Sequence, residues 1–184
     1  NSTSYARFWE ARTLWGVSLV EGRHLVGQAL TLAGHNRQGD MAQARQQAKV
    51  LAHRVCAFAY AFKNQMRLTD GRADLAKFLP AVDAERIACA RYPGAMALQL
   101  SQEWVGEQMR SGAMQPVVAP AFEHAIARLG NALGGCERIA STPIPFTYSV
   151  ILHRCIYIYC FLLPFGLVDM IGSMTPVIVC FLAY

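Results

Sequence analysis

One short segment near the end of the 184-residue sequence combines residue types that would hold the backbone out of a regular helix. In Pro143-Ile144-Pro145, two prolines remove backbone donors and bar a regular helix around a single apolar side chain. Backbone of this kind is tolerated at membrane depth where it lines a water-filled cavity, which makes Ile144 a candidate pore residue. The alternative is that the two prolines only end one helix and begin the next.

The neighbouring pair His153-Arg154 is the only basic pair in an otherwise apolar tail. A charge at the centre of a membrane costs at least about 2.5 kcal/mol, so an ionisable group there predicts a role in the pore or at a subunit interface. Asp169 lies about four helical turns away, too far for a direct pair within one helix. Glu137 or a neighbouring subunit could pair with Arg154 instead, or the side chain could extend to lipid headgroups.

The sequence gives no support for an enzyme, a cofactor or a metal site. His53 and Cys56 lie one helical turn apart, but zinc needs three or four ligands and no second pair with this spacing occurs. There is no Ser, His and Asp grouping and no glycine-rich phosphate loop. The basic residues are dispersed along the sequence, which argues against nucleic acid as a partner.

Charge is distributed very unevenly along the chain. Lys and Arg total 17, Asp and Glu total 12, and together they make 16% of the residues, against about 25% in an ordinary soluble domain. Only Arg154 and Asp169 are charged within residues 141–184, so 27 charges and the whole net charge of +5 fall in residues 1–140. The composition therefore predicts a water-facing helical region over 1–140 and a transmembrane region over 141–184.

The elements that must position these residues are helices, because apolar residues recur at steps of three, four and seven and no strand-like alternation occurs. The fold class is all-α, a helical bundle with transmembrane helices. Gly134-Gly135 predicts either a kink or a close approach of another backbone. The predicted helices cover residues 1–33, 41–68 with Asp40 as N-cap, 74–78, 83–91, 95–110 and 116–139.

The apolar tail is long enough to cross a bilayer. Residues 143–168 contain one charge, and a second apolar segment begins at Pro176. A buried core helix is the alternative, because the strictly uncharged stretch has only 14 residues. Arg128 and Arg138 precede the span and no Lys or Arg follows it, so residues 1–140 are expected in the cytoplasm.

Three stretches, taken in order, resemble the bacterial branch of the bestrophin channel family. They are Asn1–Gly16, Leu133–Leu167 and Met174–Pro176, and the most specific part is Cys136-Glu137-Arg138-Ile139 followed by Thr142-Pro143-Ile144-Pro145-Phe146. The resemblance implies a homopentamer in the inner membrane, multi-pass, with one pore on the five-fold axis. It places the lower constriction, the pore aperture, at Ile144 between Pro143 and Pro145.

The same resemblance implies passive flow of small monovalent ions, either chloride or, as in bacterial members, sodium and potassium. Selection is expected to rest on pore diameter and hydrophobic constrictions rather than on a fixed charged ring. The family's first membrane helix and upper constriction would precede Asn1, its C-terminal part would follow Tyr184, and calcium gating has no support here. The competing hypothesis is a non-conducting, membrane-attached helical scaffold or regulator.

Overall fold

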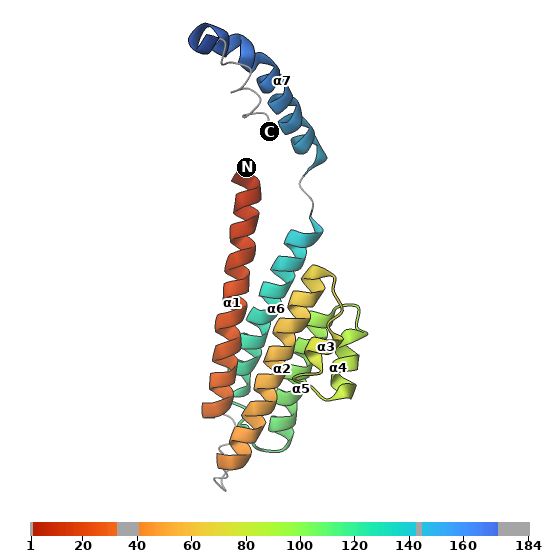
Figure 1. Cartoon of the computed structure of the whole chain (residues 1–184). Coiled ribbons are helices and arrows are strands. Elements are labelled where there is room, and N and C mark those ends of the chain that lie inside the picture. Colours follow the sequence, from red (N-terminus) through yellow and green to blue (C-terminus); the bar gives the residue numbers. More distant parts are fainter. Residues whose placement is uncertain (1, 33–40, 143–144, 173–184) are drawn as a thin grey trace. The chain divides into compact units, whose positions relative to one another are not determined.

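The computed structural model describes residues 2–32, 41–142 and 145–172, except for the side chains of residues 2 and 167–171. All regular structure in this part is helical, as the hydrophobic periodicity predicted (Figure 1). The helices are α1 (Ser2–Leu32), α2 (Met41–Arg67), α3 (Arg72–Leu75), α4 (Ala81–Ala88), α5 (Pro93–Arg110), α6 (Ala119–Ser141) and α7 (Phe146–Ile171).

The predicted boundaries differ from the observed ones mainly at prolines and in the short helices. α5 begins at Pro93 rather than at residue 95, because proline lacks only a donor that the first helical turn leaves unpaired anyway. α4 begins directly after Pro80 and ends at Ala88, short of the predicted Arg91. The predicted N-cap Asp40 lies outside the described residues.

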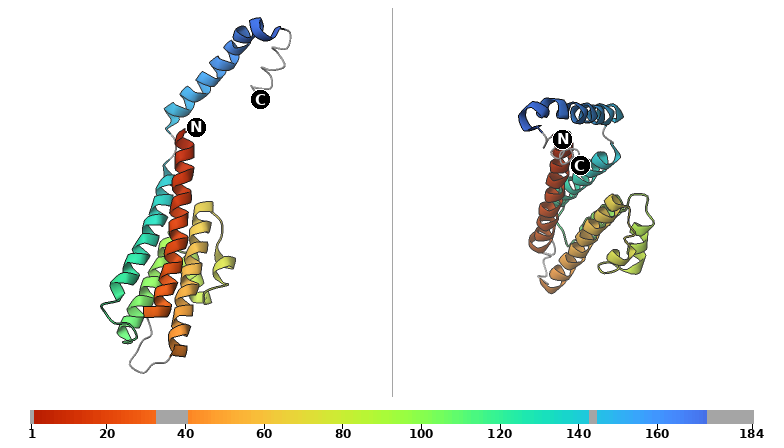
Figure 2. Two further views of the ribbon diagram at one scale, coloured as in Figure 1. Left: turned by 90° about the vertical axis from the view of Figure 1, so that its left-hand side faces the viewer. Right: turned by 45° about the horizontal axis from the view of Figure 1, so that its top comes forward.

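The chain divides into two compact units, Asn1–Ser141 and Thr142–Tyr184. In the first unit, α1, α2, α5 and α6 form a bundle, and α3 and α4 lie beside α2 and α5 (Figure 2). Neighbouring helices run antiparallel: Gly22 of α1 faces Val55 of α2, and Trp104 of α5 stacks on Phe122 of α6 with ring centroids 5.9 Å apart. The start of α1 and the ends of α2 and α6 therefore lie at one end of the bundle.

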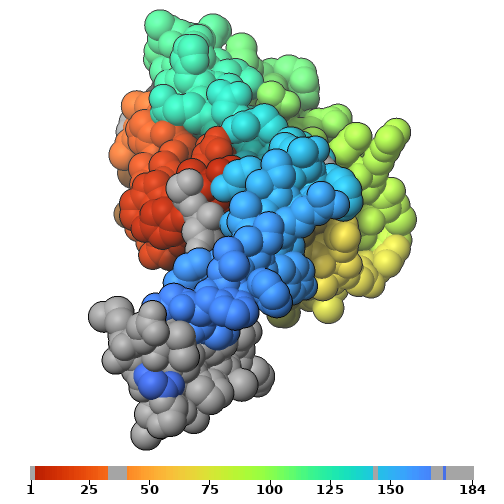
Figure 3. Space-filling view, turned by 90° about the horizontal axis from the view of Figure 1, so that it is seen from above, coloured from red at the N-terminus to blue at the C-terminus, as the bar shows by residue number. Residues whose placement is uncertain are grey.

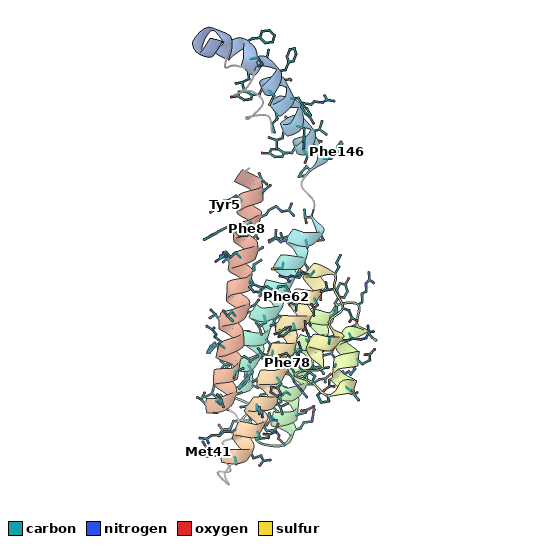
Figure 4. The ribbon with its side chains drawn as sticks, viewed as in Figure 1. Tyr5, Phe8, Met41, Phe62, Phe78 and Phe146 are labelled. Atoms are coloured by element: carbon teal, nitrogen blue, oxygen red, sulfur yellow. The ribbon has the colours of Figure 1, made fainter. Side chains whose placement is uncertain are left out.

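The core of the bundle is built from aromatic and aliphatic side chains at helical spacing. Phe58 and Phe62 of α2 are almost fully buried, and Phe62 also contacts Trp15 of α1 at 4.6 Å between ring centroids (Figure 4). Trp104 and Phe122 fill the α5–α6 side of the same core. Packing of this kind carries most of the stability of helices in proteins, because single helices are marginal in water.

α1 and α6 approach each other closely at a glycine. A methyl group on Gly135 would lie 2.7 Å from Leu14 Cδ1, whereas the position of Gly134 has no neighbour within 4 Å. α6 runs without interruption through both residues. What comes close at Gly135 is therefore the Leu14 side chain of α1 rather than the predicted backbone, and Figure 3 shows the surfaces of α1 and α6 adjoining.

Five of the six cysteines lie within the described residues. The five described ones are free thiols, but only Cys136 is buried, while Cys56, Cys89 and Cys155 are exposed and Cys160 is partly buried.

Gly135→Ala should destabilise the bundle, while Gly134→Ala should stabilise it. Overpacking typically costs about 1–3 kcal/mol, more than the roughly 0.5–1 kcal/mol that alanine gains over glycine inside a helix. Gly134→Ala carries the gain without the clash and is the matched control. Thermal unfolding of the two variants in detergent would measure both effects, and equal shifts would show that the Leu14 contact does not limit the approach.

Candidate functional site

The predicted aperture lies only partly within the described residues. Pro143 and Ile144 fall outside them, so their role remains a prediction. Pro145 is exposed and immediately precedes α7, where its carbonyl oxygen accepts hydrogen bonds from the Tyr148 and Ser149 amides at 3.0 and 3.4 Å. This residue therefore supplies the first helical acceptor of α7, which is one of the two roles that the sequence left open for the prolines.

His153 and Arg154 lie on α7 and are both exposed within their unit. The Nδ1 atom of His153 lies 2.7 Å from the Ser149 carbonyl oxygen one turn earlier. Arg154 forms no ion pair with any described residue. Glu137, a predicted partner of Arg154, accepts a hydrogen bond from Gln65 of α2. The local geometry thus leaves both the pore and the interface roles of this pair as predictions.

α7 has the length and composition of a membrane span. Its segment Phe146–Gly166 is 21 residues long and is the only described helix that meets both criteria, and none of that window is buried. Large side chains such as Phe146, Tyr157 and Phe165 are exposed along it. Pro164 lies inside the helix and leaves the Cys160 carbonyl without its usual donor. The predicted second segment from Pro176 lies outside the described residues.

An apolar groove of about 390 Å³ runs between α1 and α2. Trp15 and Leu19 from α1 and Val55 and Phe62 from α2 line it, with Arg23 and Cys56 also on its walls. Nearer its start, α1 exposes Tyr5, Phe8 and Trp9 (Figure 4). Trp15, further along α1, instead contacts Phe62 of α2 at the edge of the core.

The corner between α2 and α3 is held by one carboxylate. Asp74 lies 2.6 Å from Lys63 Nζ, 3.1 Å from Lys77 Nζ and 3.3 Å from Asn64 Nδ2. Hydrogen bonds from Lys63, Lys77 and Asn64 hold the pKa of Asp74 well below its usual range. This carboxylate therefore fixes the position of Lys63 on α2.

Two features of the described residues were missed from the sequence. Val117 is 79% exposed, follows Pro116 and lies on non-helical backbone between α5 and α6. It thus shares with Ile144 the proline neighbour and apolar type that singled out the predicted aperture. The second feature is the alignment of basic residues on α2, which only the helical repeat reveals.

His53 and Cys56 do not form a site together. The His53 ring packs edge-on against Phe78 at 6.4 Å, while Cys56 lies in the groove beside α1. Although part of Cys56 is exposed, partial desolvation in the groove raises the pKa of its thiol. In the described part of the chain no group of three His, Cys, Asp or Glu residues is arranged to hold a metal ion.

A compact, basic helical unit joined to an apolar helix of membrane length defines an all-helical membrane protein. The family model for "Bacterial/Fungal Bestrophin protein" matches residues 1–184. The chain belongs to the bestrophin family, which is a family of membrane channel proteins rather than of enzymes.

Several curated relatives match along the whole chain. The voltage-dependent anion channel-forming protein RSc3414 of Ralstonia nicotianae is 45% identical, and the voltage-dependent anion channel-forming protein YneE of Escherichia coli K12 is 34% identical, each over 100% of this chain. A crystal structure of a bacterial bestrophin homolog from Klebsiella pneumoniae has a TM-score of 0.85 and 35% identity, and the match covers 100% of this chain and 66% of that one. The chain spans 58% of the length of these two curated relatives.

Acidification should weaken the α2–α3 corner through Asp74. Because the folded-state pKa is depressed, the carboxylate contributes stability above its unfolded pKa of about 3.9 and loses it as the pH falls toward the folded value. The protein should therefore lose thermal stability between about pH 4 and pH 2 more steeply than the Asp74→Asn variant. Unfolding temperatures across this range would measure the difference; parallel curves would show that Asp74 contributes nothing to the acid response.

Proposed function

We propose that this chain is part of a channel subunit that passes small monovalent anions, chloride among them, passively across the bacterial inner membrane. The observation that carries the proposal is the match of the entire chain to the bestrophin family, including relatives named as anion channel-forming proteins. The membrane-length helix α7, exposed throughout its window, supports a membrane role. Sodium and potassium are the alternative ions.

The proposed assembly is a homopentamer with residues 1–140 in the cytoplasm and residues 141–184 in the membrane region. A closed ring of identical subunits creates a pore on its axis without any further component. Arg128 and Arg138, which precede α7, agree with a cytoplasmic position for the bundle. A non-conducting scaffold requires no such ring, so a stable monomer in detergent would favour the scaffold.

Within this assembly, Ile144 is the proposed aperture residue, flanked by Pro143 and Pro145. A narrow ring of apolar side chains gates by excluding water, and smaller side chains widen it and ease wetting. His153 and Arg154 are proposed to lie at the pore wall or between subunits, where water or a neighbouring carboxylate offsets the cost of their charge.

Ile144→Ala should increase chloride conductance and admit larger anions, because five shortened side chains widen the aperture. Purified protein in planar bilayers, with reversal potentials recorded in chloride, nitrate and thiocyanate gradients, would measure conductance, ion sign and size selection together. Val117→Ala is the matched variant, since it removes a similar apolar side chain beside another proline.

If only Val117→Ala changes conductance and size selection, the constriction lies at Val117 and the Ile144 assignment is wrong. If the reversal potentials follow sodium or potassium instead of chloride, the channel is a cation channel. A protein that passes no ion as a stable monomer would leave the scaffold as the better function.

A further inference from the structure

The positive charge of the chain is concentrated in a single helix. α2 contains Arg45, Lys49, Arg54, Lys63 and Arg67 and no Asp or Glu. The chain as a whole has 17 basic and 12 acidic residues, so the remaining residues balance and α2 equals the entire net charge of +5. The basic character of this protein is therefore a property of one helix rather than of its whole surface.

Four of these five cations share one side of α2. At about 100° per residue, Arg45, Lys49, Lys63 and Arg67 fall within about 40° of one another around the helix axis. Arg54 points the other way: it donates to the Leu100 carbonyl oxygen and lies 4.0 Å from Glu107 of α5. The outward side of α2 thus carries a row of cations about 33 Å long, from residue 45 to residue 67.

The gap in this row is filled by α1. Between Lys49 and Lys63 the outward residues of α2 are Ala52, Cys56 and Ala59, and all three line the groove together with Arg23 of α1. We call Arg23, Arg45, Lys49, Lys63 and Arg67 the cationic strip.

Carboxylates that could neutralise the strip are directed elsewhere. Glu21 of α1 pairs with Arg128 of α6 at 2.8 Å, and Glu10 of α1 pairs with Arg138 of α6. Lys63 is the exception, since Asp74 binds it, but Asp74 also binds Lys77 and leaves that corner with a net positive charge. Arg23, Arg45, Lys49 and Arg67 form no ion pair with any described residue.

The strip leads to the end of the bundle from which the membrane segment departs. Arg67 and Lys63 border the same pocket as Ile139 and Ala140 near the end of α6. Phe146, the first residue of α7, follows Ala140 by only six positions in the sequence. The Arg67 end of the strip therefore lies beside the end of α6, from which the chain continues toward α7.

We infer that the cationic strip lines the aqueous path of the channel and concentrates small anions along it. The inference rests on the proposed function and adds fixed charge as a second basis for ion selection, beside the apolar constriction. Surfaces of one sign raise the local concentration of counter-ions, and a fixed charge acts over about 8 Å at physiological ionic strength. A series of cations along the path can therefore attract an anion over the whole length of α2. A single ring of charged side chains would attract it only within about one screening length.

Fluorescence quenching tests the strip without any need for ion flow. Trp15 borders both the groove beside Arg23 and the pocket beside Lys63 and Arg67, and its side chain is 44% exposed. The Trp15 signal is taken as the difference between the assembled protein and its Trp15→Phe variant. With each ion's quenching scaled to its quenching of free tryptophan, iodide should quench this signal at least about twofold more than caesium at low salt, and added salt should remove the difference.

Neutral acrylamide is the control for access. If acrylamide fails to quench Trp15 in the assembled protein, a neighbouring subunit or another partner covers this face, and the inference is wrong. If acrylamide quenches Trp15 but iodide and caesium quench it equally, this face is exposed to water but does not attract anions. That result also overturns the inference.

Conductance then tests the strip in the working channel. The triple variant Arg45→Gln, Lys49→Gln and Arg67→Gln should lower chloride conductance at least about twofold at low salt and reduce chloride selectivity over potassium. Near 1 M salt, where charges act over only about 3 Å, the loss should vanish. The control variant Arg86→Gln, Arg91→Gln and Arg110→Gln removes the same net charge from α4, α5 and the loop between them.

Equal effects of the two triple variants, or a loss that persists in high salt, would contradict a role of the strip in the ion path. If the unmodified protein passes no anion, the proposed function fails, and with it the role of the strip in conduction. The quenching result would then still show whether the strip attracts anions from water. Failure of the inference and failure of the proposed function are thus distinguished.

Discussion

The contact between α1 and α6 is the constraint on which the rest of the helical unit depends. Gly135 lets Leu14 pack directly against the backbone of α6, and the ion pairs Glu21–Arg128 and Glu10–Arg138 lie on either side of that contact. Arg7 adds a hydrogen bond to the Ile139 carbonyl oxygen in the last turns of α6. Residues later in α1 contact residues earlier in α6, so these contacts fix the antiparallel register of the two helices. The segment that leads into α7 thus leaves the bundle beside the start of α1.

This pairing also determines the charge of the opposite face. Because both carboxylates of α1 are used against α6, none remains for the side of α1 that adjoins α2. α2 itself has no acidic residue, and its inward cation Arg54 is satisfied by α5. The result is a face on which an apolar groove and unneutralised cations lie next to each other. This face is cationic for two reasons. α2 supplies the basic residues, and the two carboxylates of α1, Glu10 and Glu21, pair with α6 instead of with α2.

Much of the fold could be predicted from the sequence because helical periodicity is local. The long helices follow from residue spacing alone, whereas at Gly134-Gly135 the sequence left two explanations open and only Gly135 has a close neighbour, the Leu14 side chain. The start of α5 at Pro93 was missed, because a proline can either end one helix or begin the next. Only the packing of the flanking residues determines which of the two occurs. In the site, the role of Pro145 at the start of α7 was one of two stated alternatives. The cationic strip was missed because its members are far apart in sequence, and Arg23 comes from a different helix, so a linear reading finds only dispersed basic residues.

An apolar constriction and a cationic strip select ions by different properties. A ring of apolar side chains discriminates by diameter and by the cost of removing water, and this cost is high for anions and cations alike. Fixed cations discriminate by sign, and they do so in wide, hydrated regions where a ring of isoleucine has no effect. A channel that used only the first device would be indifferent to sign wherever the two ions have similar size and hydration. In the proposed channel, the concentration of the whole net charge in α2, outside the membrane helix, would therefore separate the selection of sign from the control of access.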